Sequence, residues 1–205
     1  MKIAIMQPYF FPYLGYFKLI SKVDKFIFLD DAQYTRKGWI NRNFINIKNP
    51  VKLTIPVKKA SRSSKINEIL VSDGWMKRHL RTFLHVYGKK CLFSNFFLYY
   101  STLKDHKFLS PLLCDTVIWT SKLIGINVEF TYSSLFPSIK KGKDRIIELC
   151  KLNQATEYCN LPNGIHLYEK NEFYNEGINI NFIDTSKYQK ISVIDHLLNF
   201  DKIII

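Results

Sequence analysis

The 205-residue sequence lacks the signatures of several large enzyme classes. It contains no G-x-G-x-x-G or G-x-x-x-x-G-K-[ST] phosphate loop, no H-E-x-x-H zinc helix and no G-x-S-x-G nucleophile turn. These absences exclude the commonest nucleotide-binding, zinc-protease and hydrolase patterns. The chemistry must therefore be found in less general features.

Cysteine and long apolar segments are also scarce. The four cysteines stand 23, 36 and 9 residues apart and include no C-x-x-C pair, so neither a zinc site nor a disulfide scaffold is expected. No apolar run reaches the roughly 18 residues of a membrane span, and the apolar start is interrupted at Gln7-Pro8, too early for a signal peptide. We therefore predict a cytoplasmic protein.

Acidic residues are rare in one third of the chain. Residues 36–90 contain fourteen Lys or Arg and two acids, a net charge of +12 out of a formal +13 for the whole chain. Such a segment favours an anionic partner, which could be the phosphates of a small ligand, an RNA or an anionic membrane surface. A biased composition is the alternative source of the excess, because Lys outnumbers Arg 24 to 6.

Short apolar runs that alternate with segments of helical spacing are typical of α/β proteins. Residues 2–6 and 25–29 predict parallel strands joined by a helix that begins at Pro12, and residues 39–47 and 51–57 predict an antiparallel hairpin. Further strands are expected at 66–71, 126–132, 156–160 and 178–183. Further helices are expected at 75–87, within 95–124 as a pair broken at Ser110-Pro111, and at 144–152, 169–175 and 192–200.

These elements predict one α/β domain over residues 1–205. It combines a mostly parallel Rossmann-like sheet with a β-hairpin and a helical insertion at about 75–124. Open parallel sheets bind ligands at the carboxyl ends of their strands. The loop after the first strand and the pair Asp30-Asp31 after the second are therefore predicted to lie together at such an edge.

The loop and helix start at residues 7–17 form the strongest local signal, with two prolines and several aromatic rings. A stiff aromatic surface can stack on a base or a sugar ring, and Gln7 can supply a hydrogen bond. An aromatic plug that closes the core is the alternative. Because Asp30 and Asp31 are adjacent, we expect them to point to opposite sides, so that one at most faces a ligand; turn formation is the other interpretation.

Seven segments also carry a family resemblance. They are Gln7-Pro8-Tyr9…Pro12-Tyr13-Leu14-Gly15-Tyr16-Phe17, Phe28-Leu29-Asp30-Asp31-Ala32-Gln33, Trp39-Ile40-Asn41-Arg42-Asn43, Asp144-Arg145-Ile146…Ala155-Thr156-Glu157-Tyr158, Asn160-Leu161-Pro162-Asn163-Gly164, Leu167-Tyr168 and Ser192-Val193-Ile194-Asp195. Over nearly its whole length the chain resembles the WbqC-like family of bacterial surface-polysaccharide gene clusters. It departs from the family at Met6, where many members carry His, and at Asp201, where members often have Gly.

The resemblance implies an enzyme of O-antigen or capsule synthesis that attaches a small acyl or aminoacyl group, such as glycine, to the amine of a nucleotide-linked amino sugar. Amide formation needs an activated donor, which could be a coenzyme A thioester, an acyl-adenylate made from ATP or an aminoacyl-tRNA. The expected partner is the nucleotide-linked amino sugar, with no stable nucleic-acid partner and no membrane span. A homo-oligomer is compatible with the sequence.

For this reaction we expect Asp30 to act as the base or ammonium anchor, and Gln7 and Asn41 as amide donors to an oxyanion or phosphate. Further ligand contacts are expected at Pro8, Tyr9, Tyr13, Gly15, Tyr16, Asp31, Gln33, Lys37, Trp39, Arg42, Asn160, Gly164 and Tyr168, with Arg42 on phosphate and no metal ligand. Two alternatives are an RNA-binding module, which would use more Arg than this chain has, and a nucleotidyltransferase, whose H-x-G-H signature is absent.

Overall fold

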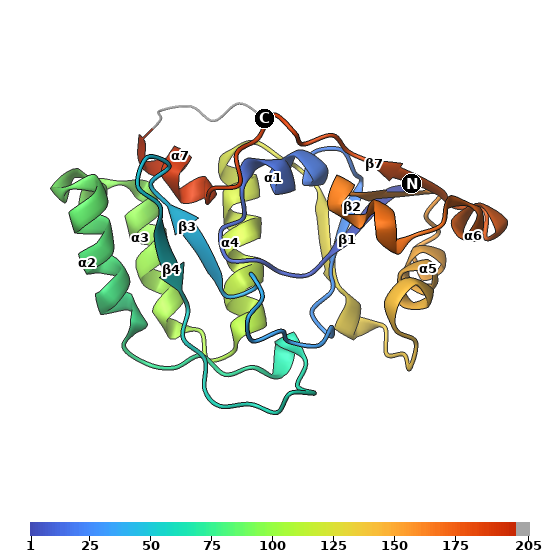
Figure 1. Ribbon diagram of the computed structural model, residues 1–205, viewed down its shortest axis with the longest axis horizontal. Coiled ribbons are helices and arrows are strands. Elements are labelled where there is room, and N and C mark those ends of the chain that lie inside the picture. The colour runs from blue at the N-terminus through green and yellow to red at the C-terminus, as the bar shows by residue number, and fades with distance from the viewer. Residues whose placement is uncertain (200–205) are drawn as a thin grey trace.

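The computed structural model describes residues 1–199 and has a five-stranded parallel sheet at its centre (Figure 1). The strands are β1 (Lys2–Met6), β2 (Lys25–Phe28), β5 (Glu129–Tyr132), β6 (Glu157–Asn160) and β7 (Asn179–Phe182). Their order in the sheet is β5-β2-β1-β6-β7, and all neighbours are parallel. The predicted parallel pairing of the first two strands is confirmed, with Ile3 opposite Lys25 and Met6 opposite Phe28.

This strand order is that of a doubly wound fold. From β1 the chain adds β2 and β5 on one side, then returns to add β6 and β7 on the other. The direction reverses between β1 and β6, and ligands bind at the carboxyl ends of strands at such a point. The predicted α/β class with a mostly parallel sheet is therefore confirmed.

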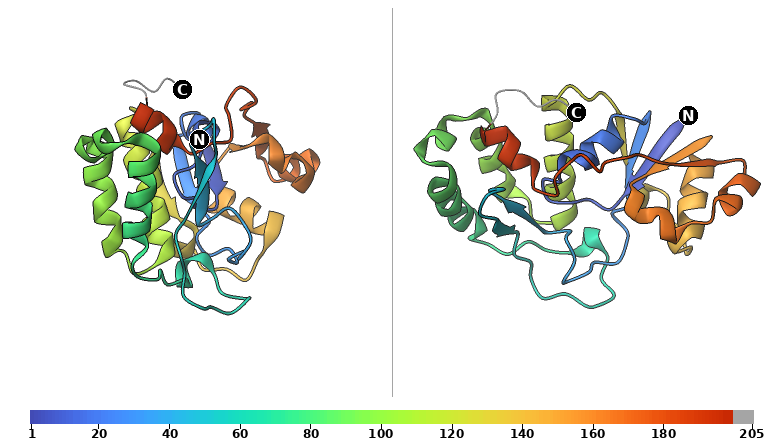
Figure 2. Two further views of the ribbon diagram at one scale, coloured as in Figure 1. Left: turned by 60° about the vertical axis from the view of Figure 1, so that its left-hand side comes forward. Right: turned by 45° about the horizontal axis from the view of Figure 1, so that its top comes forward.

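Helices cover both faces of the sheet (Figures 1 and 2). On one side lie α1 (Leu14–Ile20) and α4 (Leu109–Leu123), with α2 (Trp75–Tyr87) and α3 (Asn95–Thr102) beyond α4. On the other side lie α5 (Gly142–Leu152) and α6 (Lys170–Asn175). The strands alternate accordingly, because Ala4 packs into the core on the α4 side while Ile3 and Ile5 pack on the α5 side. No helix in the described part of the chain is long and apolar enough for a membrane span.

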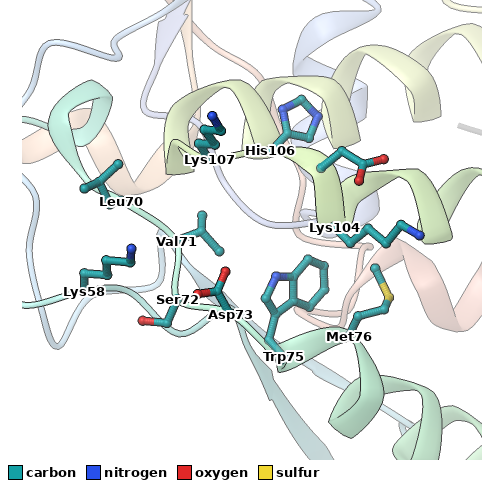
Figure 3. Close-up of a pocket in the computed structure, with 12 residues that line it drawn as sticks. Lys58, Leu70, Val71, Ser72, Asp73, Trp75, Met76, Lys104, His106 and Lys107 are labelled. Carbon is teal, nitrogen blue, oxygen red and sulfur yellow. The ribbon is translucent and has the colours of Figure 1, made fainter.

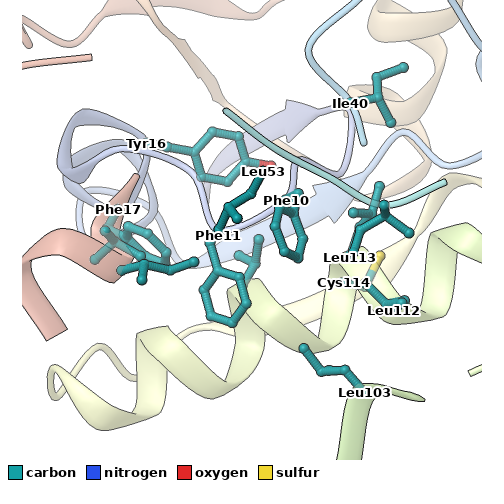
Figure 4. Packing of buried hydrophobic residues seen from close by; sticks show 14 of the residues in the cluster. Phe10, Phe11, Tyr16, Phe17, Ile40, Leu53, Leu103, Leu112, Leu113 and Cys114 are labelled. Atoms are coloured by element: carbon teal, nitrogen blue, oxygen red, sulfur yellow. The ribbon is translucent and has the colours of Figure 1, made fainter. Parts of the chain in front are cut away.

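The larger core is rich in aromatic side chains from the loop after β1 (Figure 4). Phe10 and Phe11 of this loop and Phe17 of α1 are fully buried there, in the same cluster as Leu112 and Leu113 of α4. The ring of Phe11 stacks on that of Tyr100 in α3, with 5.8 Å between centroids. This part of the loop therefore fills the core between the sheet and the helices α3 and α4.

The hairpin forms at the predicted place but is shorter. Its strands are β3 (Arg42–Ile45) and β4 (Val51–Thr54), paired antiparallel with Ile45 opposite Val51. β3 ends because Asn46 takes a left-handed φ of 61°, which leaves Ile47 45% exposed rather than in the core.

A residue of the helix α7 (Val193–Asn199) stabilises this hairpin turn by hydrogen bonds. The buried carboxylate of Asp195 accepts hydrogen bonds from the backbone N–H of Asn46 at 2.8 Å and of Ile47 at 3.1 Å, and a third from the hydroxyl of Tyr87. The predicted end of this helix, Phe200, and the family departure at Asp201 lie outside the described residues.

The strand predicted at 66–71 is wrong. The segment contains the 3₁₀ turn η1 (Ile66–Glu68) and two isolated bridges, from Val57 to Val71 and from Leu70 to Phe108. It passes between the hairpin and the start of α4 and makes only a few backbone hydrogen bonds to each. One of them runs from the Val71 N–H to the Lys107 carbonyl. An apolar run becomes a strand when a neighbour offers several consecutive partners, and here neither side does.

The predicted break between the two helices of 95–124 is also misplaced. The helices are interrupted at residues 103–108, which include the short turn η3 (Leu103–Asp105), and Pro111 lies inside the first turn of α4. A proline is tolerated in the first turn because the N–H groups there have no intrahelical partner. The proline therefore marks the beginning of a helix here. The remaining predicted elements are present with boundaries within three residues of those expected.

His79 is a buried structural residue on α2. Its Nε2 lies 3.0 Å from the Thr54 carbonyl oxygen and must carry a proton to donate to it, while Nδ1 accepts from the Tyr100 hydroxyl at 2.5 Å. Burial lowers the pKa of His79 to about 4, below its ordinary value of 6.5. The imidazole is therefore neutral in the folded protein at pH 7.

Acid is expected to destabilise the protein through His79. The unfolded chain takes up a proton at this histidine near pH 6.5 and the folded protein only near pH 4. The free energy of unfolding should therefore fall by up to about 3 kcal/mol as the pH is lowered across this interval. Urea unfolding at pH 7 and pH 4.5 measures the loss. His79→Gln, which keeps a donor and an acceptor but does not titrate, should show a flatter dependence; parallel curves for the two proteins would contradict the assignment.

Candidate functional site at the strand switch point

A pocket of about 820 Å³ opens at the carboxyl ends of β1 and β6, where the strand order reverses; we call it the switch-point pocket. Its volume is in the range of small-molecule sites. Segments from both ends of the chain line it. They contribute Ile5, Met6, Gln7, Pro8, Tyr9, Tyr13 and Tyr16 from the first strand, loop and helix; Asn160, Leu161, Asn163, Gly164, Leu167 and Tyr168 from β6 and beyond; and Leu29, Trp39, Ile40, Ile146 and Lys190.

The aromatic side chains of residues 7–17, which we call the aromatic loop, are divided between the pocket and the core. Tyr9, Tyr13 and Tyr16 line the switch-point pocket, whereas Phe10 and Phe11 are fully buried in the core. The interpretation of the loop as a core plug therefore holds for Phe10 and Phe11. The three tyrosines line the pocket, and whether they stack on a ligand stays a prediction.

The loop has a strained backbone that is held from several sides. Phe11 has a φ of 39°, unusual for a bulky residue. Its carbonyl accepts hydrogen bonds from Asn43 Nδ2 at 2.7 Å and Ser192 Oγ at 2.8 Å, and its N–H donates to Thr116 Oγ1 at 3.3 Å. Strain of this kind persists where the surroundings over-determine the conformation, typically beside functional sites. The sequence pointed to Asn41 and Arg42, but Asn43 is the residue that shapes this loop.

Tyrosine hydroxyls organise the near wall of the pocket. The Tyr16 hydroxyl donates to the Gln7 carbonyl at 3.0 Å, and the rings of Tyr9 and Tyr16 meet edge to face. Burial raises the pKa of Tyr16 well above its usual value; it also raises that of Tyr9, with a further contribution from Tyr13. Tyr9 and Tyr16 therefore stay protonated at neutral pH and act as neutral ring surfaces and hydrogen-bonding groups.

The opposite wall brings together three of the expected residues, Asn160, Gly164 and Tyr168. The buried Asn160 accepts from the Leu161 N–H at 2.7 Å and donates to the Tyr158 hydroxyl at 3.0 Å. A Cβ at Gly164 would lie 2.6 Å from Asn160 Nδ2, so a larger residue there would displace the amide. Tyr168 packs edge-on against the ring of Tyr158.

The two acids after β2 do not line the pocket. Asp30 is 5% exposed, and its carboxylate accepts from Ser133 Oγ at 3.1 Å, Ser134 N at 3.0 Å and Ser134 Oγ at 2.8 Å. Asp31 accepts from Ser133 Oγ as well. The expectation that they point to opposite sides is wrong, because both lie beyond the last paired residue of β2, where strand alternation no longer applies.

Arg145 of α5 completes this acidic cluster. The buried guanidinium donates to Asp31 at 3.1 Å, to the carbonyls of Ser133 at 2.8 Å and Phe136 at 2.6 Å, and to Glu148 at 2.8 Å. The sequence offered Arg145 only as part of a family segment. Its partner Asp31 stands 114 positions earlier, and no local pattern shows that pairing.

Several expected contacts lie instead in the connection between β2 and β3, or at the first residue of β3. Asn41 Nδ2 donates to the Ile55 carbonyl, Arg42 Nη2 to the Arg36 carbonyl and Gln33 Nε2 to the Arg62 carbonyl, each at 2.7 Å. These side chains brace the connection, and none of them lines the pocket. Lys37 is exposed outside the lining, whereas Trp39, 55% exposed, forms part of the pocket wall.

Gly15 acts by its small size. A Cβ at this position of α1 would lie 2.3 Å from the ring of Tyr13 and 2.9 Å from Thr185. The glycine therefore lets Tyr13 and the segment around Thr185 approach the helix, although Gly15 does not itself line the pocket.

A second, smaller cavity of about 410 Å³ lies between the start of α2 and residues 104–107 (Figure 3). Its charges are mixed, because Lys58, Lys104 and Lys107 line it together with Asp73 and Asp105. It contains none of the residues expected from the sequence. Among residues 1–199, no three His, Cys, Asp or Glu side chains form a group that could hold a metal ion.

Comparison with known proteins agrees with the resemblance of the sequence segments. A family model described as the WbqC-like protein family matches residues 7–202. A Mycobacterium tuberculosis protein, named as uncharacterized protein Rv1507c, is 29% identical over 216 residues, which cover 97% of this chain and 93% of the relative. No solved structure matches the chain. The matched region begins at Gln7 and spans both walls of the switch-point pocket.

Proposed function

Because the chain belongs to the WbqC-like protein family, we propose that it is a biosynthetic transferase of surface-polysaccharide synthesis. In this proposal it attaches a small acyl or aminoacyl group, such as glycine, to the amine of a nucleotide-linked amino sugar. The observation that carries the proposal is the switch-point pocket, which combines aromatic rings with side-chain amides at the ligand-binding edge of the sheet.

The chemistry of the lining fits such a ligand. A nucleotide sugar has a base and a sugar ring, and the faces of Tyr9, Tyr13 and Trp39 can pack against rings. Gln7, Asn160 and Asn163 offer amides that can bind hydroxyl, carbonyl and phosphate oxygens. A volume of about 820 Å³ accommodates a ligand of this size.

In the reaction, we assign Gln7 to the oxyanion. The sugar amine attacks the carbonyl of the activated donor, and negative charge develops on the carbonyl oxygen. Gln7 stands exposed at the end of β1, where its side-chain N–H can donate to that oxygen, and its backbone carbonyl is held by Tyr16. Orientation of the two reactants and charge stabilisation are thus the tasks that we give to the pocket.

No carboxylate or imidazole is present among the described residues that line the pocket, and Met6 stands there at the end of β1. Asp30, the base expected from the sequence, has its carboxylate bonded to Ser133 and Ser134. We therefore assign Asp30 to holding the loop after β5. The amine proton then leaves through solvent or with the leaving group of the donor.

Transfer should be visible by mass spectrometry. Amino sugars linked to uridine diphosphate or thymidine diphosphate are incubated with three donors in turn: glycine and ATP, an acyl coenzyme A, and glycyl-tRNA. All three donors are found in the cytoplasm, where we place the protein. One donor should add the mass of its acyl group to the sugar, and no product should form from the corresponding sugar that lacks the amine.

Two matched variants locate the reaction. Asn163→Trp, at an exposed position of the lining, should fill the switch-point pocket and lower kcat/KM at least about tenfold, equivalent to about 1.4 kcal/mol. Met76→Trp fills the smaller cavity instead and should leave transfer unchanged. The proposal fails if no donor yields product. RNA binding that falls about 10³–10⁵-fold between 50 and 200 mM salt, without competition by nucleotide sugars, would favour the RNA-binding alternative.

A further inference from the structure

Lys190 is the one formally charged side chain among the described residues that line the switch-point pocket. It comes from the segment between β7 and α7, which no sequence pattern marked as functional. We propose that Lys190 binds the phosphate groups of the ligand. This inference rests on the proposed function for its ligand class, a nucleoside diphosphate linked to a sugar.

The segment that carries Lys190 begins with a hydrogen bond to the wall of the pocket that contains Asn160. The Ile183 N–H donates to the Asn160 carbonyl at 2.9 Å. Two residues later, the buried Thr185 lies 3.5 Å from the Tyr13 hydroxyl and packs against the position of Gly15. The chain therefore leaves β7 in contact with both sides of the pocket.

The end of the segment is bonded to the aromatic loop. Ser192 Oγ donates to the Phe11 carbonyl at 2.8 Å, the Ser192 N–H donates to the Phe44 carbonyl at 2.8 Å, and the Val193 N–H donates to the Pro12 carbonyl at 3.1 Å. Lys190 stands two residues before this anchor. The backbone that bears its side chain is thus fixed relative to the rings that would hold the base and the sugar.

None of the ion pairs among residues 1–199 involves the ammonium of Lys190. The other described residues that line the pocket carry no carboxylate, so an anion supplied by a ligand would meet a cation there with no competing acid. Lys187, on the same segment, is different: its ammonium lies over the Tyr188 ring, 5.0 Å from the centroid, and it does not line the pocket.

Arg42, the residue expected to bind phosphate, is engaged elsewhere. Its guanidinium donates to the Arg36 carbonyl at 2.7 Å and reaches Asn41 Oδ1 at 3.4 Å. It does not line the pocket. The cation that accompanies the aromatic rings is therefore supplied by the C-terminal part of the chain, and the basic segment 36–90 is not needed for this contact.

Calorimetric titration with paired probes tests the assignment. The probes are uridine diphosphate with uridine, and thymidine diphosphate with thymidine, so that each pair differs only in the phosphates. Lys190→Gln should weaken diphosphate binding about 10- to 100-fold, the scale of a hydrogen bond to a charged partner, and leave nucleoside binding unchanged. Lys190→Arg should keep most of the affinity, and the matched control Lys187→Gln all of it.

Three results would overturn the assignment: equal diphosphate affinity in wild type and Lys190→Gln, a loss that appears in Arg42→Gln instead, or wild-type protein that binds no diphosphate better than its nucleoside. The proposed function is tested separately. If diphosphate binding needs Lys190 but no donor gives transfer, the phosphate contact stands and the transferase proposal fails. If transfer proceeds equally well in Lys190→Gln, the transferase proposal stands and the contact fails.

Discussion

Replacing Arg145 by methionine should lower the free energy of unfolding by about 3–5 kcal/mol, the usual loss when one partner of a buried ion pair is removed. The variant leaves the Asp31 carboxylate, whose side chain is 16% exposed, without its cation. It also removes the hydrogen-bond donors to the Ser133 and Phe136 carbonyls. Urea unfolding at pH 7 measures the change. A methionine of similar length keeps most of the apolar packing, so the loss reports mainly on the polar contacts.

Two further variants make the result specific. Arg81→Met removes the same side chain from an exposed position of α2 and should change stability by less than about 0.5 kcal/mol. Asp31→Leu combined with Arg145→Met removes both charges and should recover part of the loss, since neither partner is then left buried alone. The single variant Asp31→Leu completes the cycle: if the double variant loses as much stability as Arg145→Met and Asp31→Leu added together, the pair does not interact.

The Arg145 experiment bears on how Asp30 and Asp31 are understood. If these carboxylates hold the loop after β5 in place, their variants should lose stability together with any loss of activity. A catalytic carboxylate behaves differently, because its removal lowers turnover while the fold remains intact. Measuring unfolding and transfer on the same Asp30→Asn preparation therefore separates the structural role from the role that the sequence predicted.

Gln7→Ala should lower the turnover of the proposed transfer about 10²- to 10³-fold, the scale observed when one oxyanion donor is removed. The expected change is in kcat rather than KM, because the oxyanion exists only in the transition state. Steady-state kinetics at saturating sugar nucleotide and donor give both values. Folding should be little affected, since the Tyr16 hydroxyl bonds the backbone of Gln7 and not its side chain.

Substitutions at two positions sharpen this test. Gln7→Glu keeps the size of the side chain but replaces the donor with an anion, so it should be at least as impaired as the alanine variant. Asn163→Ala removes another amide from the pocket wall and should affect KM more than kcat. A Gln7→Ala enzyme with normal kcat and raised KM would place Gln7 in contact with the ground state and remove it from the oxyanion.

The sequence predicted elements whose signal is local. Residues 2–6 and 75–87 carry clear periodicity and became β1 and α2 with the expected boundaries. The run 66–71 has the same apolar character as a strand, but whether it pairs depends on what lies beside it. Its bonds to Lys58 and Lys107 come from two different neighbours, and this arrangement is decided by the tertiary fold.

The candidate site was predictable to the extent that it follows from topology. Parallel strands bring their carboxyl ends to one edge, so Gln7, Tyr9 and Asn160 could be expected to meet before the fold was known. The orientation of Asp30 and Asp31 could not, because it is set by Ser133 and Arg145 more than 100 residues away. Lys190 gave no signal either, since a single lysine in an irregular segment looks like any solvated surface residue.

The central position of β1 determines when the site can form during folding. β1 pairs on one side with β2, which is close along the chain, and on the other with β6, about 155 residues later. The aromatic loop after β1 is also held by hydrogen bonds from Ser192 and Val193, which are synthesised close to the end of the chain. Closing such long chain loops costs entropy before any contact compensates for it, which slows folding. During synthesis the β6-facing edge of β1 and its apolar residues remain uncovered until most of the polypeptide has been made, a period in which the nascent chain is prone to aggregate.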